Sequence, residues 1–127
     1  MIALDTCFLL DYLDGVDAAA AYLRDHEDKP FFAPSLALFE VYRGAARTEG
    51  SEGIERIASG LDWVEPLGLS EPAAREAALV EAELLDTGDR INLGDALIAG
   101  VCRHHGAQIV TRDGHFDRVD GLDTEGY

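Results

Sequence analysis

The stretch Met1-Ile-Ala-Leu-Asp-Thr6 is a short apolar run that ends in an acid and a hydroxyl residue. Uninterrupted apolar runs of this kind are typical of strands buried on both faces of a parallel sheet. In such sheets the ligand crevice lies beyond the carboxyl ends of the strands. The stretch therefore predicts a buried strand that carries Asp5 to a ligand-binding edge.

The rest of the chain alternates between strand-like and helix-like segments. This alternation predicts a single α/β domain over residues 1–127, with a mostly parallel sheet of four to five strands covered on both faces. We expect further strands at 30–33, 61–67 and 108–111, with a short edge strand at 122–124. We expect helices at 17–27, from 35 to 44 or 47, at 51–59, at 70–85 and at 92–105. Gly44 is interpreted as either the end of its helix or a point of close approach.

The composition is strongly acidic. The chain has 10 Lys+Arg against 25 Asp+Glu, for a formal net charge of −15, and Lys29 is its one lysine. With 47% hydrophobic residues it is nevertheless a globular domain, not a disordered tail. An acid-coated surface repels nucleic acids at low salt, but at about 1 M salt the Debye length is about 3 Å. The composition therefore predicts a halophilic protein, for which RNA remains a possible substrate.

The sequence gives few signals of location. Cys7, expected just beyond the first strand, and Cys102, expected inside a helix, have no zinc-like spacing and are interpreted as buried free thiols. No basic leader and no apolar run near 18 residues is present. We therefore expect a cytoplasmic protein that does not associate with a membrane.

Four acids stand at positions where the predicted fold can gather them. Asp5 and Asp113 are at or just past strand ends, Asp95 is in the first turn of a helix, and Glu40 lies among apolar residues of another. Clustered carboxylates need a divalent cation to be tolerable, and Mg²⁺ or Mn²⁺ held this way hydrolyses phosphodiesters. We predict all four as catalytic residues, with Asp5, Asp95 and Asp113 binding metal directly and Glu40 acting through water.

Four neighbouring residues are candidates for supporting roles. Thr6 and Thr111 can orient a carboxylate or a water, although bonds to local backbone are an equal alternative. Arg43 and Arg112 are the nearest candidates to bind phosphate, against the alternative of surface ion pairs. The four histidines lack convergent spacing, so no metal role is expected for them.

The ordered set of acidic motifs resembles the PIN-domain nucleases of the VapC toxin type. The matching pieces are Leu4-Asp-Thr6, Glu40-Val-Tyr-Arg-Gly44, Asp95-Ala-Leu-Ile-Ala99 and Thr111-Arg-Asp-Gly-His-Phe116. The resemblance implies a three-layer α/β/α sandwich, Mg²⁺- or Mn²⁺-dependent endoribonuclease activity, frequent homodimers and inhibition by a cognate antitoxin. It places the family's four acids on Asp5, Glu40, Asp95 and Asp113, and its small hydroxyl on Thr6.

Two other functions compete for the same acids. A catalytically silent PIN-fold module could keep the fold only to bind a partner protein. An aspartate phosphotransfer domain, of the receiver or phosphatase type, would also place an aspartate after the first strand. However, Asp5-Thr6-Cys7 lacks the second acid two residues on, and Lys29 is poorly placed to bind phosphate.

Overall fold

A five-stranded sheet, parallel throughout, forms the centre of the computed structural model, which describes residues 1–127. The strands are β1 (Ile2–Leu4), β2 (Phe31–Pro34), β3 (Val64–Leu67), β4 (Gln108–Val110) and β5 (Asp123–Glu125). Their order in the sheet is β3-β2-β1-β4-β5. The predicted strand number and parallel pairing are confirmed, with β1 at the centre as its apolar run requires.

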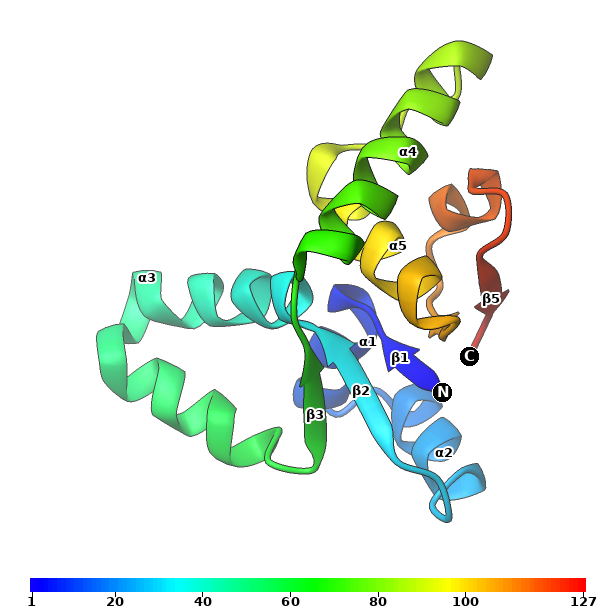
Figure 1. Cartoon of the computed structure of the whole chain (residues 1–127). Coiled ribbons are helices and arrows are strands. Elements are labelled where there is room, and N and C mark those ends of the chain that lie inside the picture. Colours follow the sequence, from blue (N-terminus) through cyan, green and yellow to red (C-terminus); the bar gives the residue numbers. More distant parts are fainter.

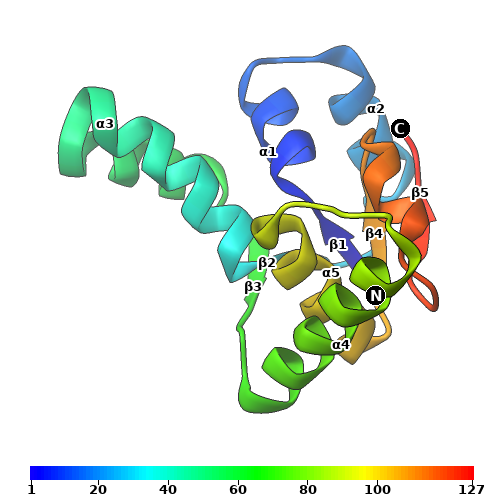
Figure 2. The same ribbon diagram turned by 90° about the horizontal axis from the view of Figure 1, so that it is seen from above.

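The helices cover both faces of this sheet. They are α1 (Thr6–Leu13), α2 (Asp17–Asp25), α3 (Ser35–Gly60), α4 (Glu71–Thr87) and α5 (Leu93–His105). Figure 2 shows α1 and α2 on one side of the strands, with α4 and α5 on the other. The predicted α/β sandwich is confirmed. No helix combines the length and the apolar character that a bilayer-spanning segment needs.

The central strand is fully enclosed. Ile2, Ala3 and Leu4 are all buried, and β1 pairs with β2 on one side and β4 on the other. Leu4 is paired with Val110, so the chain leaves both strands at the same edge of the sheet. That shared edge places the residues that follow β1 and β4 next to each other.

The helix α1 was missed by the sequence analysis. It starts at Thr6, directly after the strand, and Asp5 is its N-cap because Asp5 Oδ1 accepts a hydrogen bond from the backbone N–H of Phe8. Cys7 therefore lies just beyond the strand, as expected, in the first helical turn, but it is half-buried and not buried as predicted. The remaining unexpected element is a short 3-10 helix, η1 (Gly114–Arg118).

The helix α3 projects from the sheet as an arm. Figures 1 and 2 both show it extending away from the strands, and Figure 1 shows it turning back to β3. The turn is at Gly50, where φ is 63° and ψ is −145°, so the expected separation into two helices near residue 50 is confirmed. Gly44 lies within the first half with open space around it, so both interpretations of that glycine were wrong.

Helices α4 and α5 are in backbone contact at one point. A Cβ atom added to Gly100 would lie 2.4 Å from Cα and 2.5 Å from Cβ of Ala77. Real Cβ atoms do not approach so closely, and a backbone atom cannot rotate away. Only glycine at position 100 allows these two helices to pack at this distance.

We predict that Gly100→Ala lowers the free energy of unfolding by about 1–3 kcal/mol or more, because α4 and α5 must separate. The measurement is urea denaturation. Gly44→Ala is the matched control, since nothing lies within 4 Å of its added Cβ. In an exposed helix interior this control should gain about 0.5–1 kcal/mol. Equal effects of the two substitutions would contradict the close packing.

Candidate metal centre

Asp5 is the most enclosed acid of the predicted set. Its side chain is held on both oxygens: Oδ1 accepts from the N–H of Phe8 at 2.9 Å, and Oδ2 accepts from the hydroxyl of Thr111 at 2.5 Å. Only 2% of the residue is exposed. The Thr111 bond links the ends of the paired strands β1 and β4 and fixes the carboxylate at the edge of the sheet.

Glu40 approaches the same edge from α3. Its Oε1 accepts a hydrogen bond from the hydroxyl of Thr6 at 3.0 Å. The carboxylate also lies against the first turn of α5, since a Cβ placed on Gly94 would be 3.8 Å from Oε1 and 3.9 Å from Oε2. Glu40 is half-buried, and it brings a second carboxylate next to the residue that follows Asp5.

Asp95 lies in the first turn of α5, as expected. Asn92 caps that helix: its Oδ1 accepts from the N–H of Asp95 at 2.8 Å, and its Nδ2 donates to Asp95 Oδ2 at 3.0 Å. The amide therefore fixes both the backbone and the carboxylate of Asp95. The sequence analysis did not single out Asn92, although asparagine three residues before an acid at a helix start is a recognisable capping pattern.

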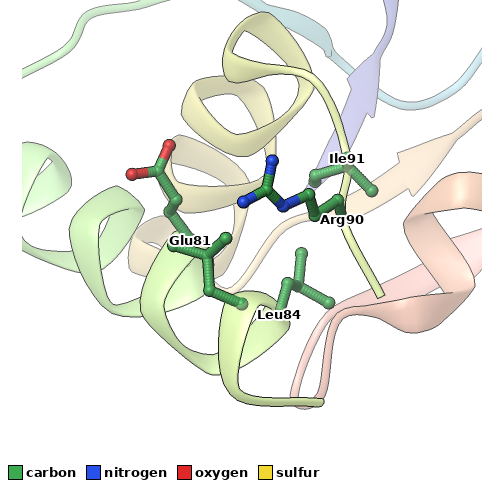
Figure 3. A pocket seen from close by; sticks show the side chains of 5 residues that line it. Glu81, Leu84, Arg90 and Ile91 are labelled. Atoms are coloured by element: carbon green, nitrogen blue, oxygen red, sulfur yellow. The ribbon is translucent and has the colours of Figure 1, made fainter. Parts of the chain in front are cut away.

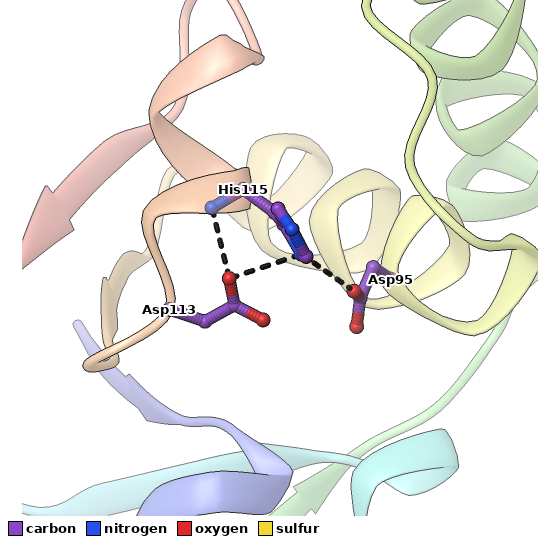
Figure 4. Close-up of side chains that lie close together, drawn as sticks. All are labelled: Asp95, Asp113 and His115. Atoms are coloured by element: carbon purple, nitrogen blue, oxygen red, sulfur yellow. Dashed lines mark hydrogen bonds and ion pairs between the residues drawn. The ribbon is translucent and has the colours of Figure 1, made fainter.

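Asp113 completes the group from the loop after β4. Its Oδ1 accepts from the N–H of His115 at 2.9 Å and lies 3.0 Å from the same residue's Nδ1. That Nδ1 is also 3.9 Å from Asp95 Oδ2, and Figure 4 shows the three side chains converging. One ligand atom of each of Asp95, Asp113 and His115 lies within 4.8 Å of the others. The expectation that no histidine has a ligand-like arrangement was therefore wrong for His115.

The acids affect one another electrostatically. Burial raises the pKa of Asp5 to about 6, and the charges of Asp113 and Asp95 add to the rise. Burial also raises the pKa of Asp95, as do Asp113 and Glu40, while His115 opposes the rise. The four acids therefore lie within range of one another's charge. The neighbouring charges make ionisation of Asp5 and Asp95 less favourable, in addition to the larger effect of burial.

The donor set fits a hard dication. Carboxylate oxygens are the ligands that Mg²⁺ and Mn²⁺ prefer, and a bound dication would favour the ionised carboxylates that burial and the neighbouring acids disfavour. The residues that could hold it together are Asp95 and Asp113, with His115 beside them. Asp5 and Glu40 are not in that group, although their charges act on it. His115 adds an imidazole, a ligand more typical of transition metals such as zinc and iron than of magnesium or manganese.

The two threonines make the contacts expected of orienting residues. Thr6 donates to Glu40, and Thr111 donates to Asp5 while its oxygen accepts from the N–H of Asp113 at 2.9 Å. The sequence left open whether Thr111 orients a carboxylate or bonds to the local backbone. In the structure it does both.

The two arginines have different surroundings. The guanidinium of Arg43 lies 5.4 Å from the ring centre of the exposed Phe39. Arg112 forms an ion pair of 3.3 Å with Asp11. Their proposed role in binding phosphate stays a prediction.

Cavities elsewhere do not involve the acids. One of about 230 Å³ lies between the end of α4 and the segment before α5 (Figure 3), lined by Glu81, Leu84, Leu85, Arg90 and Ile91. Lys29 lines another together with Met1 and Gln108, at the edge where the strands begin. The one lysine is therefore at the opposite end of the strands from Asp5, which argues against an aspartate phosphotransfer site.

Comparisons with known proteins agree with this architecture. Among solved structures, VapBC2 from Rickettsia felis bound to a DNA fragment from its promoter matches with a TM-score of 0.90 at 21% identity, covering 100% of this chain and 99% of that chain. A toxin–antitoxin complex from Klebsiella pneumoniae matches with a TM-score of 0.76 at 21% identity, covering 96% and 95%. The Mycobacterium tuberculosis VapC20, a sarcin-ricin loop cleaving toxin, matches with a TM-score of 0.66 at 20% identity, covering 92% and 93%.

At these identities the structural matches establish the fold. A search of curated protein sequences found no significant match. The sequence profile of the PIN domain family matches residues 2–122, nearly the whole chain. This chain therefore belongs to the PIN domain family.

Proposed function

We propose that this protein is a metal-dependent endoribonuclease that hydrolyses RNA phosphodiester bonds, and that it is the toxin of a toxin–antitoxin pair. The observation that carries the proposal is the convergence of Asp5, Glu40, Asp95 and Asp113, each oriented by a hydrogen-bond donor of the chain. Four acids crowded this way weaken a fold unless they serve a cation.

The residues around the acids would keep the site in order before substrate arrives. Thr111, Thr6 and Asn92 hold Asp5, Glu40 and Asp95, and the N–H of His115 holds Asp113. Such outer contacts fix the direction of ligand lone pairs. A bound Mg²⁺ or Mn²⁺ would supply a water of lowered pKa and charge relief on the phosphoryl oxygens. The preset carboxylates would hold that ion in place, so that water and phosphate can be aligned for in-line attack.

The partners follow from the proteins of similar fold. The structural relatives include a toxin–antitoxin complex and a toxin that cleaves RNA of the sarcin-ricin loop. We infer a cognate antitoxin protein as the inhibitor and cellular RNA as the substrate, and we propose that the protein acts in the cytoplasm.

We also propose a homodimer, because several large apolar side chains remain on the surface. Phe39, the residue before Glu40, is 52% exposed. Leu93, two residues before Asp95, is 64% exposed, and Leu79 on α4 is 54% exposed. Sedimentation equilibrium should give twice the chain mass of 13.7 kDa. A monomer at micromolar concentration would contradict this assignment.

We predict that the purified protein cleaves RNA only with Mg²⁺ or Mn²⁺, and that Asp5→Asn lowers the rate by at least about 100-fold. Asparagine keeps the N-cap acceptor for Phe8 but removes the charge that a dication needs. The measurement is initial-rate cleavage of labelled RNA, with folding of the variant checked by circular dichroism.

Asp62→Asn is the matched control, since it makes the same charge change at an exposed residue before β3. It should cleave at the wild-type rate. Cleavage in excess EDTA, or full activity of Asp5→Asn, would contradict the nuclease mechanism. A folded wild-type protein that binds metal but cleaves no RNA would favour the silent binding module.

We predict a characteristic pH dependence of stability without metal. The folded-state pKa of Asp5 is about 6, above its ordinary value of 3.8, so the folded state binds the proton more tightly. The proton on Asp5 therefore stabilises the folded state fully below about pH 4. This stabilisation is lost as pH rises from 4 towards 6 and is absent above pH 6. A rise of this size corresponds to roughly 3 kcal/mol.

Asp5→Asn should therefore be more stable than the wild type at pH 7.5 in EDTA and nearly equal to it at pH 4, as measured by urea denaturation. Mn²⁺ should raise the stability of the wild type at pH 7.5 and leave that of Asp5→Asn nearly unchanged. A wild type that gains stability steadily between pH 4 and 6 relative to the variant would show that Asp5 is not strained by its neighbours.

A further inference from the structure

Asp11 is a buried acid that lies outside the metal centre. It is on α1, and only 6% of the residue is exposed. Its Oδ2 accepts a hydrogen bond from the hydroxyl of Tyr127 at 2.6 Å and lies 3.3 Å from Nη1 of Arg112. A carboxylate so enclosed is costly unless it is paired, and both of its partners come from more than one hundred residues away.

Arg112 uses this anchor while its outer side faces solvent. Its side chain is 61% exposed, and its Nη1 lies 3.3 Å from Oδ2 of Asp11. A guanidinium has five N–H donors in a rigid plane, so most of them remain available to a second ligand. The arrangement leaves Arg112 fixed on one side and free to bind on the other.

Arg112 is also at the rim of the metal centre. It directly precedes Asp113, and with Thr111 and Asp113 it lines a cavity of about 200 Å³. The thiol of Cys7 lies among the same groups: burial and Asp5 raise its pKa, Arg112 lowers it, and Asp113 raises it. The guanidinium therefore shares its surroundings with two of the four acids.

Two other arginines form ion pairs that are exposed on both sides. Arg56 and Arg75 pair with Glu49 and Glu71, whose side chains are 47% and 66% exposed. Exposed pairs of this kind exchange readily with water and fix little. The Asp11 side chain is only 8% exposed, and the Tyr127 ring packs edge-on against Phe8 at 4.7 Å between ring centres, which holds the hydroxyl in place.

We propose that Asp11 and Tyr127 position Arg112 to bind a backbone phosphate of single-stranded RNA next to the acid cluster. The inference rests on the proposed ribonuclease function and names a part of its substrate site. A polyanion approaching a chain of net charge −15 is repelled except where a cation is presented, and a guanidinium fork matches phosphate in charge and geometry. Asp11 is thus a positioning residue that acts through Arg112.

The test measures binding of a fluorescein-labelled oligouridylate by anisotropy, in an Asp5→Asn background with Mg²⁺ so that the probe stays intact. Arg112→Gln should weaken binding about tenfold, and Asp11→Asn about threefold. In the Arg112→Gln background, Asp11→Asn should have no further effect, because its contribution passes through the missing guanidinium. Tyr127→Phe, which keeps the ring, is the second positioning variant if Asp11→Asn does not fold.

Salt dependence separates a phosphate contact from a purely structural role. The slope of log affinity against log salt should be smaller by about 0.7 for Arg112→Gln, the value for one contact with a single strand. Arg56→Gln removes the same charge from the far half of α3 and is the matched control, with an unchanged slope. Both variants lose one positive charge, so the general repulsion between the acidic surface and RNA affects them equally.

Each outcome decides the inference. Unchanged affinity and slope in Arg112→Gln would overturn the phosphate contact, and additive losses in the double variant would show that Asp11 is only structural. If the oligouridylate affinities follow the predicted pattern but the wild-type protein cleaves no RNA, the ribonuclease proposal fails while the Arg112 contact stands. If no variant binds any RNA, both fail.

Discussion

Burial of the Asp5 carboxylate at the edge of the parallel sheet, next to other acids, is the constraint on which the rest of this structure depends. Asp5 cannot move away from its neighbours, because it caps α1 through Phe8 and accepts from Thr111 at the same time. Thr6 and Asn92 hold two of the other acids in the same fixed manner. The architecture thus keeps like charges together, at a cost in stability that a cation can reverse.

Much of the fold could be predicted from the sequence because its periodic signals agree. The apolar run before Asp5 and the alternation of strand and helix segments are sufficient to indicate an enclosed parallel sheet. The helix α1 was missed because residues 6–13 continue an apolar run, and because Asp5 was considered as a ligand and not as an N-cap. The N-cap role of Asp5 therefore went unrecognised.

The site was harder to predict than the fold. The four acids stand in motifs that sequence can recognise, but their convergence depends on how α3 and α5 reach the end of β1. His115 gave no signal, since its approach to Asp95 and Asp113 depends on the turn of η1 and not on spacing along the chain. Asp11 likewise looks like a surface acid until Tyr127 returns to cover it. Contacts between distant parts of the chain leave no local pattern.

The bond from Thr111 to Asp5 joins residues 106 positions apart, since β1 lies at the centre of the sheet and its neighbour β4 comes near the end of the chain. Translation adds about 5–20 residues per second, so a nascent polypeptide exposes Asp5 for seconds before β4 exists. During that time the first carboxylate has neither Thr111 nor Asp113 beside it. The order of the strands therefore delays assembly of the acid cluster until synthesis is nearly finished.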